Sequence, residues 1–113
     1  MSADHPYSLA FEKDGIVYIS GAVGVDADHN AVLGDRECLD AALDAVERRL
    51  QSVGLDLSHV VKTTYFATSV ALRDQANEQY EERFSDPRPA RSFIGVADLP
   101  YDARIAIEAI AHR

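Results

Sequence analysis

The sequence predicts an α+β fold in which one sheet carries two helices on one face, in the order β-β-α-β-α-β-β. Three observations predict it: a hairpin signal near the N-terminus, two segments with apolar residues at helical spacing, and three later segments rich in strand-forming residues. A length of 113 residues is typical of one domain, which we expect to span residues 1–113.

The first two strands are expected at Ser8–Lys13 and Ile16–Ser20. They flank Asp14-Gly15, a dipeptide that suits the positive φ angles of a tight hairpin turn. The polar segment Gly24–Gly34 follows and is expected to form a loop.

The first helix is expected to begin near Asp35, which we predict to be its N-cap, and to stop at Gly54. Its apolar residues are spaced so that they fall on one face of a helix. They are Leu39, Leu43, Val46, Leu50 and Val53.

The second helix is indicated by apolar residues at every fourth position before Pro87 and Pro89, two residues that end helices. These apolar residues are Leu72, Ala76, Tyr80 and Phe84. The three remaining strands are rich in β-branched and aromatic residues. They are expected at Val60–Thr68, Arg91–Val96 and Ala103–Ala111.

The last strand is apolar on both of its faces. Ile107 and Ala109 point to one side, whereas Ala106 and Ile110 point to the other. Two helices can cover only one face of the sheet, and a large exposed apolar face is unusual in a monomer. We therefore expect the second face to meet another subunit.

The formal net charge of −8 and the absence of a basic block argue against a nucleic-acid or anionic-membrane partner. No signal-peptide pattern and no long apolar stretch is present, which favours a cytoplasmic location.

The single cysteine, Cys38, excludes an intramolecular disulfide and a paired-cysteine zinc site. The four histidines show no helical ligand spacing, so no metal is expected.

Arg91 is the main candidate for a binding residue. It follows Pro89-Ala90 at the start of a predicted strand, and a guanidinium can hold a carboxylate by two parallel hydrogen bonds. Taken alone, this position fits a surface or ion-paired arginine better than a binding site.

The run from Pro89 to Pro100 resembles the signature of the Rid (reactive intermediate deaminase, YjgF-like) family. Further segments resemble the same family in order along nearly the whole chain. They are Pro6-Tyr7, Ile19-Ser20-Gly21, Val60–Thr64, Asn77–Tyr80 and Ile105–Ala111.

The resemblance implies a fold like that of trimeric chorismate mutase, in which three sheets surround a central barrel. It also implies a homotrimer with active sites in the clefts between subunits. The implied activity is that of a hydrolase that deaminates enamines and imines such as 2-iminobutanoate and 2-iminopropanoate to 2-oxo acids and ammonia, without a cofactor. Ribonuclease activity is also attributed to the family, but an acidic chain supports it poorly.

The resemblance assigns carboxylate binding and catalysis to Arg91, with Tyr7 and Ser20 as hydroxyl groups that orient substrate or water. Asn77, Gly21 and Phe93 would line the substrate site. For Tyr7, Ser20 and Asn77, a purely structural hydrogen bond is an equally good interpretation.

Two positions depart from the family pattern. Phe93 replaces a site cysteine, and Ala106 replaces a glutamate that orients the attacking water in deaminating members. Glu108 lies two residues further along the strand, about 6.5 Å away, and is a possible substitute. Tyr101 and Asp102, in a nearby loop, are weaker candidates. Two alternatives therefore stay open: a non-catalytic trimer that binds a small carboxylate, and a divergent, pathway-specific enzyme.

Overall fold

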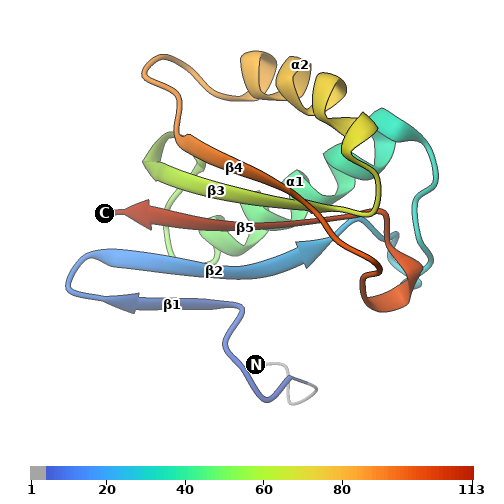
Figure 1. Cartoon of the computed structure of the whole chain (residues 1–113). Helices are drawn as coiled ribbons and strands as arrows, with labels where there is room; N and C mark the ends of the chain where they lie inside the picture. Colours follow the sequence, from blue (N-terminus) through green and yellow to red (C-terminus); the bar gives the residue numbers. More distant parts are fainter. Residues whose placement is uncertain (1–4) are drawn as a thin grey trace.

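The computed structural model describes residues 5–113, and its strands form one sheet in the order β1-β2-β5-β3-β4 (Figure 1). The main elements are β1 (Ala10–Lys13), β2 (Ile16–Val23), α1 (Asp35–Gln51), β3 (Val60–Ala67), α2 (Arg73–Arg83), β4 (Ala90–Gly95) and β5 (Ile105–His112). Short 3-10 turns lie at Leu57–His59, Val70–Leu72 and Pro100–Asp102. The predicted order of strands and helices is confirmed.

The first hairpin turns at Asp14-Gly15, as predicted, with φ angles of 54° and 80°. Strand β1 begins two residues later than predicted and pairs only with Ile16–Ile19 of β2. Strand β2 continues beyond the predicted end to Val23. Within residues 5–113, the part of β2 after Ser20 therefore has no strand beside it on the β1 side.

A β-bulge interrupts the pairing of β2 with β5. Ile19 pairs with Ala109 and Ala22 pairs with Ile107, so Ser20 and Gly21 together lie opposite a single residue of β5, Glu108. The bulge follows directly after Ile19, whose partner Ala10 is the first residue of β1.

Helix α1 buries four of the five predicted stripe residues, because Leu39, Leu43, Val46 and Leu50 are fully buried. Val53 lies beyond the end of the helix and is only partly buried. The prediction that Asp35 caps this helix is wrong. Gly34 is the N-cap and supplies no side chain, whereas Asp35 is the first helical residue. The Asp35 carboxylate instead accepts a hydrogen bond of 2.6 Å from Arg104, which precedes β5. The helix ends at Gln51, three residues before the predicted stop, and Gly54 follows with the left-handed φ of 80° that favours glycine.

Helix α2 is shorter than predicted, because Leu72 lies in the preceding 3-10 turn and Phe84 follows the last helical residue. Both residues are nevertheless buried, as are Ala76 and Tyr80. The hydroxyl of Tyr65 on β3 donates a 2.7 Å hydrogen bond to Gln79 of α2. Tyr65 pairs in register with Ile107, which belongs to the same buried core as α1, so both helices lie on one face of the sheet (Figure 1).

The opposite face of the sheet carries exposed apolar side chains. Tyr18, Ile94 and Ile110 have exposed fractions of 45%, 42% and 36%. Register pairs Tyr18 with Ile110, and places Ile94 beside Phe66 and Phe66 beside Ala106. The predicted apolar character of both faces is confirmed, and coverage of this face by another subunit stays a prediction.

Replacing Gly24 by alanine should destabilise the fold. A Cβ atom at Gly24 would lie 2.6 Å from the carbonyl oxygen of Cys38 and 2.7 Å from Cγ2 of Ile105. We expect the free energy of unfolding to fall by about 1–3 kcal/mol in a urea titration. Gly21→Ala is the matched control, since a Cβ there meets no atom of residues 5–113 within 4 Å. Equal stability of the two variants would contradict the close contact at Gly24.

Candidate functional site

The guanidinium of Arg91 lies among three aromatic rings on the helix-covered side of the sheet. Arg91 is on β4, an edge strand, and pairs with Thr63 of β3. Its Cζ atom is 5.3 Å from the ring centre of Tyr65, 4.9 Å from that of Tyr80 and 5.5 Å from that of Phe93. The rings hold the cation in place through their π faces.

Arg91 has a neutral hydrogen-bond partner. Its Nη2 donates to Oδ1 of Asn77, on α2, while its buried Nη1 has no partner within residues 5–113. None of the ion pairs formed by these residues includes Arg91. The positive charge is thus not compensated by a carboxylate, which contradicts the interpretation of Arg91 as an ion-paired arginine.

The aromatic neighbours of Arg91 do not supply a negative charge either. Burial raises the pKa of both Tyr65 and Tyr80 above the ordinary value for a phenol. Both side chains therefore stay neutral in the physiological range. An anion that approaches Arg91 would meet an uncompensated guanidinium in partly apolar surroundings, where electrostatic attraction is stronger than in water.

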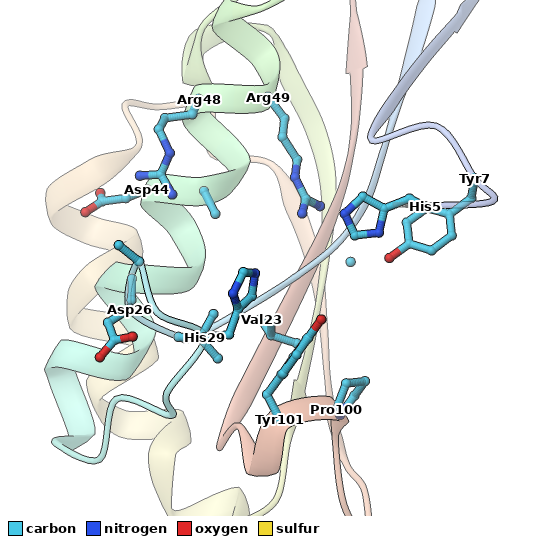
Figure 2. Close-up of a pocket in the computed structure, with 15 residues that line it drawn as sticks. His5, Tyr7, Val23, Asp26, His29, Asp44, Arg48, Arg49, Pro100 and Tyr101 are labelled. Carbon is cyan, nitrogen blue, oxygen red and sulfur yellow. The ribbon is translucent and has the colours of Figure 1, made fainter. Parts of the chain in front are cut away.

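Tyr7 and Gly21 line a pocket of about 880 Å³ at the part of β2 that β1 leaves uncovered (Figure 2). Helix α1 forms one wall through Arg49, and the loops that carry His29 and Tyr101 form another. A side chain at Gly21 would project into open space, which makes this part of the backbone accessible.

Ser20 is already engaged within the chain. Its hydroxyl donates a 2.6 Å hydrogen bond to the carbonyl of Ser8, and its own carbonyl accepts a 2.7 Å bond from Nη1 of Arg49. The structural interpretation of the Ser20 hydroxyl is therefore supported, and a direct role with substrate stays a prediction.

The candidate residues form two groups that are separated along the strand order of the sheet. Arg91 and Phe93 lie on β4 and Asn77 lies above them on α2, whereas Ser20 and Gly21 lie on β2, with Tyr7 near them. Strands β5 and β3 separate β2 from β4. A single chain does not bring the two groups together.

Glu108 and Ala106 lie on the open face of the sheet, away from the rings around Arg91. Glu108 is exposed and stands between the Ser20-Gly21 bulge and Thr64 of β3. Ala106 is 6% exposed and pairs with Val23 on one side and Phe66 on the other. Glu108 is therefore a neighbour of the β2 group and not of Arg91.

Sequence reasoning missed Arg49 and the aromatic residues Tyr65 and Tyr80 as parts of the two groups. For Tyr80 the sequence predicts a core position in the second helix, within a segment that resembles the family, but no contact with Arg91. A signal for Arg49 was available, because it stands next to the buried Leu50 and three residues after the buried Val46. A charged side chain so close to an apolar stripe often extends over buried surface.

Cys38 is buried, and its thiol donates a 3.2 Å hydrogen bond to the carbonyl of Asp35. Burial raises the pKa of this thiol, so it is poorly suited to act as a nucleophile.

Within residues 5–113 no group of three histidine, cysteine or acidic side chains is arranged to hold a metal ion. Over the same residues no helix has the length and apolarity needed to span a bilayer.

Comparison with known proteins gives one family. The family model described as Endoribonuclease L-PSP matches residues 1–113. The chain is 37% identical to a human protein named 2-iminobutanoate/2-iminopropanoate deaminase, over 94% of this chain and 79% of that protein. It is 34% identical to a RutC family protein of Aquifex aeolicus, over 94% of this chain and 87% of that one.

Solved structures have the same fold. A RidA protein from an Antarctic Psychrobacter species superimposes with a TM-score of 0.90 at 28% identity, covering 99% of this chain and 92% of that one. The YjgF gene product of E. coli superimposes with a TM-score of 0.84 at 28% identity, covering 98% and 91%.

If Arg91 binds a carboxylate, as the sequence predicts, replacing Asn77 by aspartate should weaken that binding. The substitution places a carboxylate where the neutral amide now accepts the Arg91 hydrogen bond, so the guanidinium becomes part of a permanent ion pair. We expect calorimetry with 2-oxobutanoate to show at least roughly tenfold weaker binding for Asn77→Asp. Asn77→Ala, which leaves the charge unpaired, should lose less affinity. The reverse order would contradict a binding role for the uncompensated charge.

Proposed function

Because this chain belongs to the Endoribonuclease L-PSP family, which includes the Rid proteins, we propose that it hydrolyses small 2-imino acids to 2-oxo acids and ammonia. The observation that carries the proposal is the half-buried Arg91 guanidinium, held by aromatic rings and an amide, with no carboxylate of residues 5–113 in an ion pair with it. The deaminase names of relatives near 35% identity support the same reaction.

In this reaction Arg91 binds the carboxylate of the imino acid and thereby positions the adjacent C=N carbon for attack. The oxygen of a water molecule bonds to that carbon, the carbon–nitrogen bond breaks, and nitrogen leaves as ammonia with both protons of the water. Carboxylate recognition restricts the activity to imines that carry an acid group next to the reacting carbon.

The complete site of this proposal is composite. One copy of the chain contributes the Arg91 group, and a second copy contributes the pocket at Gly21. Within one copy the two groups are separated by strands β5 and β3. The exposed apolar residues Tyr18, Ile94 and Ile110 on the open face support association of copies. The family resemblance favours a homotrimer.

The acid that orients the water is proposed to be Glu108, because its carboxylate is exposed and lies opposite the Ser20-Gly21 bulge. Ala106 occupies the position where the family pattern has a glutamate, and it pairs with Val23 of β2 and Phe66 of β3. This difference favours, as a second candidate function, a trimer that binds a small carboxylate without turning it over.

The description of the family as an endoribonuclease finds little support in a chain with a net charge of −8.

Arg91→Ala should remove the rate enhancement. With 2-iminobutanoate generated in situ, we expect the parent protein to accelerate 2-oxobutanoate formation over a protein-free blank, and the variant to lose roughly 10- to 100-fold of kcat/KM. The matched control is Arg73→Ala, an exposed arginine of α2. A parent that binds 2-oxobutanoate through Arg91 but does not accelerate the reaction would establish the non-catalytic alternative.

A complementation experiment tests the composite site. Arg91→Ala removes one group of residues, and Gly21→Leu fills the open space in the other. Each variant alone should be inactive. When equal amounts of both variants assemble at random, about three quarters of the trimers are mixed, and each mixed trimer has one intact site of its three. Activity should therefore return to about one quarter of the parent value. Continued inactivity of the mixture, with mixed trimers demonstrated by two affinity tags, would contradict a site shared between copies.

A further inference from the structure

The half-buried arginines of residues 5–113 divide into two classes. Three of them lie within 4.0 Å of a carboxylate: Arg36 beside Asp40, Arg83 beside Asp44 and Arg104 beside Asp35. The other two are Arg49 and Arg91, and no carboxylate of this part of the chain lies within that distance of either. One of the two therefore occurs in each group of candidate site residues.

Arg49 extends from α1 into the pocket at the β2 bulge. Its Nη1 donates to the carbonyl of Ser20 at 2.7 Å, which is its one hydrogen bond within the described chain. Figure 2 shows its side chain reaching toward His5, which stacks against Tyr7 with ring centres 5.1 Å apart. A carbonyl satisfies one N–H group but does not neutralise the charge, so the guanidinium can still bind an anion.

Two carboxylates line the same pocket, and only that of Asp44 has a cationic partner within the described residues. Asp44 forms an ion pair of 3.0 Å with Arg83, and Oδ1 of Asp26 accepts two backbone N–H groups of its own loop at 2.9 Å. The exposed Arg48 also lines the pocket and adds positive charge. Within residues 5–113, Arg48 and Arg49 have no carboxylate within 4.0 Å, and Asp26 is the one lining carboxylate without a cationic partner, so the lining keeps a small excess of positive charge that favours an anionic ligand.

The environment of Arg49 makes an unpaired charge unfavourable. Burial lowers the pKa of Arg49 below its ordinary value, which reflects the cost of removing its charge from water. A carboxylate in the pocket would offset that cost, because a buried cation is stabilised by a hydrogen-bonded anion.

We propose that Arg49 binds the second carboxylate of a 2-imino dicarboxylic acid, while Arg91 of another copy holds the carboxylate next to the imine carbon. This inference rests on the proposed function, and it names the substrate class. A substrate with one acid group would leave one of the two uncompensated guanidiniums without an anion. The imines formed by oxidation of aspartate and glutamate have the required two carboxylates, and they hydrolyse to 2-oxo dicarboxylic acids and ammonia.

The test compares two imines made in situ by amino-acid oxidases, one from glutamate and one from 2-aminobutyrate. The readout is the ratio of their rate enhancements. We expect the parent to favour the dicarboxylic imine roughly tenfold or more. Arg49→Gln, which removes the charge but keeps an amide donor, should reduce that ratio by a similar factor. Arg49→Lys, which keeps the charge, should recover part of it.

Arg73→Gln is the matched control, because Arg73 is exposed on α2 and is not among the residues that line the pocket. It should leave the ratio at the parent value. Binding of 2-oxoglutarate and 2-oxobutanoate, measured by calorimetry, gives a second readout that does not require turnover. The loss of affinity in Arg49→Gln should be larger for 2-oxoglutarate.

The outcomes separate this inference from the proposed function. If the parent accelerates both imines equally, or if Arg49→Gln leaves the rate and affinity ratios unchanged, dicarboxylate recognition is wrong while deamination stands. If the parent accelerates neither imine but binds 2-oxoglutarate more tightly through Arg49, dicarboxylate recognition stands and deamination is wrong.

Discussion

A buried chain of hydrogen bonds connects the sheet to both helices, and the position of the candidate site depends on it. The Tyr65 hydroxyl donates to Oε1 of Gln79 at 2.7 Å, and the Gln79 amide donates to Asp40 of α1 at 2.9 Å. Gln79 is fully buried, so breaking the chain would leave polar groups unsatisfied in the core. These bonds hold α2 above β3, and α2 in turn places Asn77 and Tyr80 against Arg91.

The second group of site residues depends on a different feature, the short length of β1. Because β1 pairs only with the first half of β2, the bulge at Ser20-Gly21 opens onto a pocket and is not covered by a neighbouring strand. Arg49 binds the carbonyl exposed there. The two groups thus arise from independent parts of the fold, which explains why each is well formed in one chain although they lie apart.

Charge compensation distinguishes the two arginines of the candidate site from the other half-buried arginines of residues 5–113. Arg36 and Arg104 have nearby carboxylates and connect segments of the fold, whereas Arg91 and Arg49 have only neutral acceptors among residues 5–113. A half-buried cation without an anion reduces the stability of the protein by itself. An anionic ligand would offset that cost, and the small imino acids of the proposed function carry the carboxylate that this requires.

The sequence by itself determined the hairpin at Asp14-Gly15, the buried stripe of α1 and the order of the elements, because turns and periodic apolar spacing are local properties. It also indicated Arg91 through the family resemblance. Only the tertiary structure decided which charges are compensated. Asp35 binds Arg104, 69 residues away, instead of capping its helix, and Arg49 meets Ser20 across 29 residues. Such partners are chosen by how the chain packs, and no local pattern encodes them.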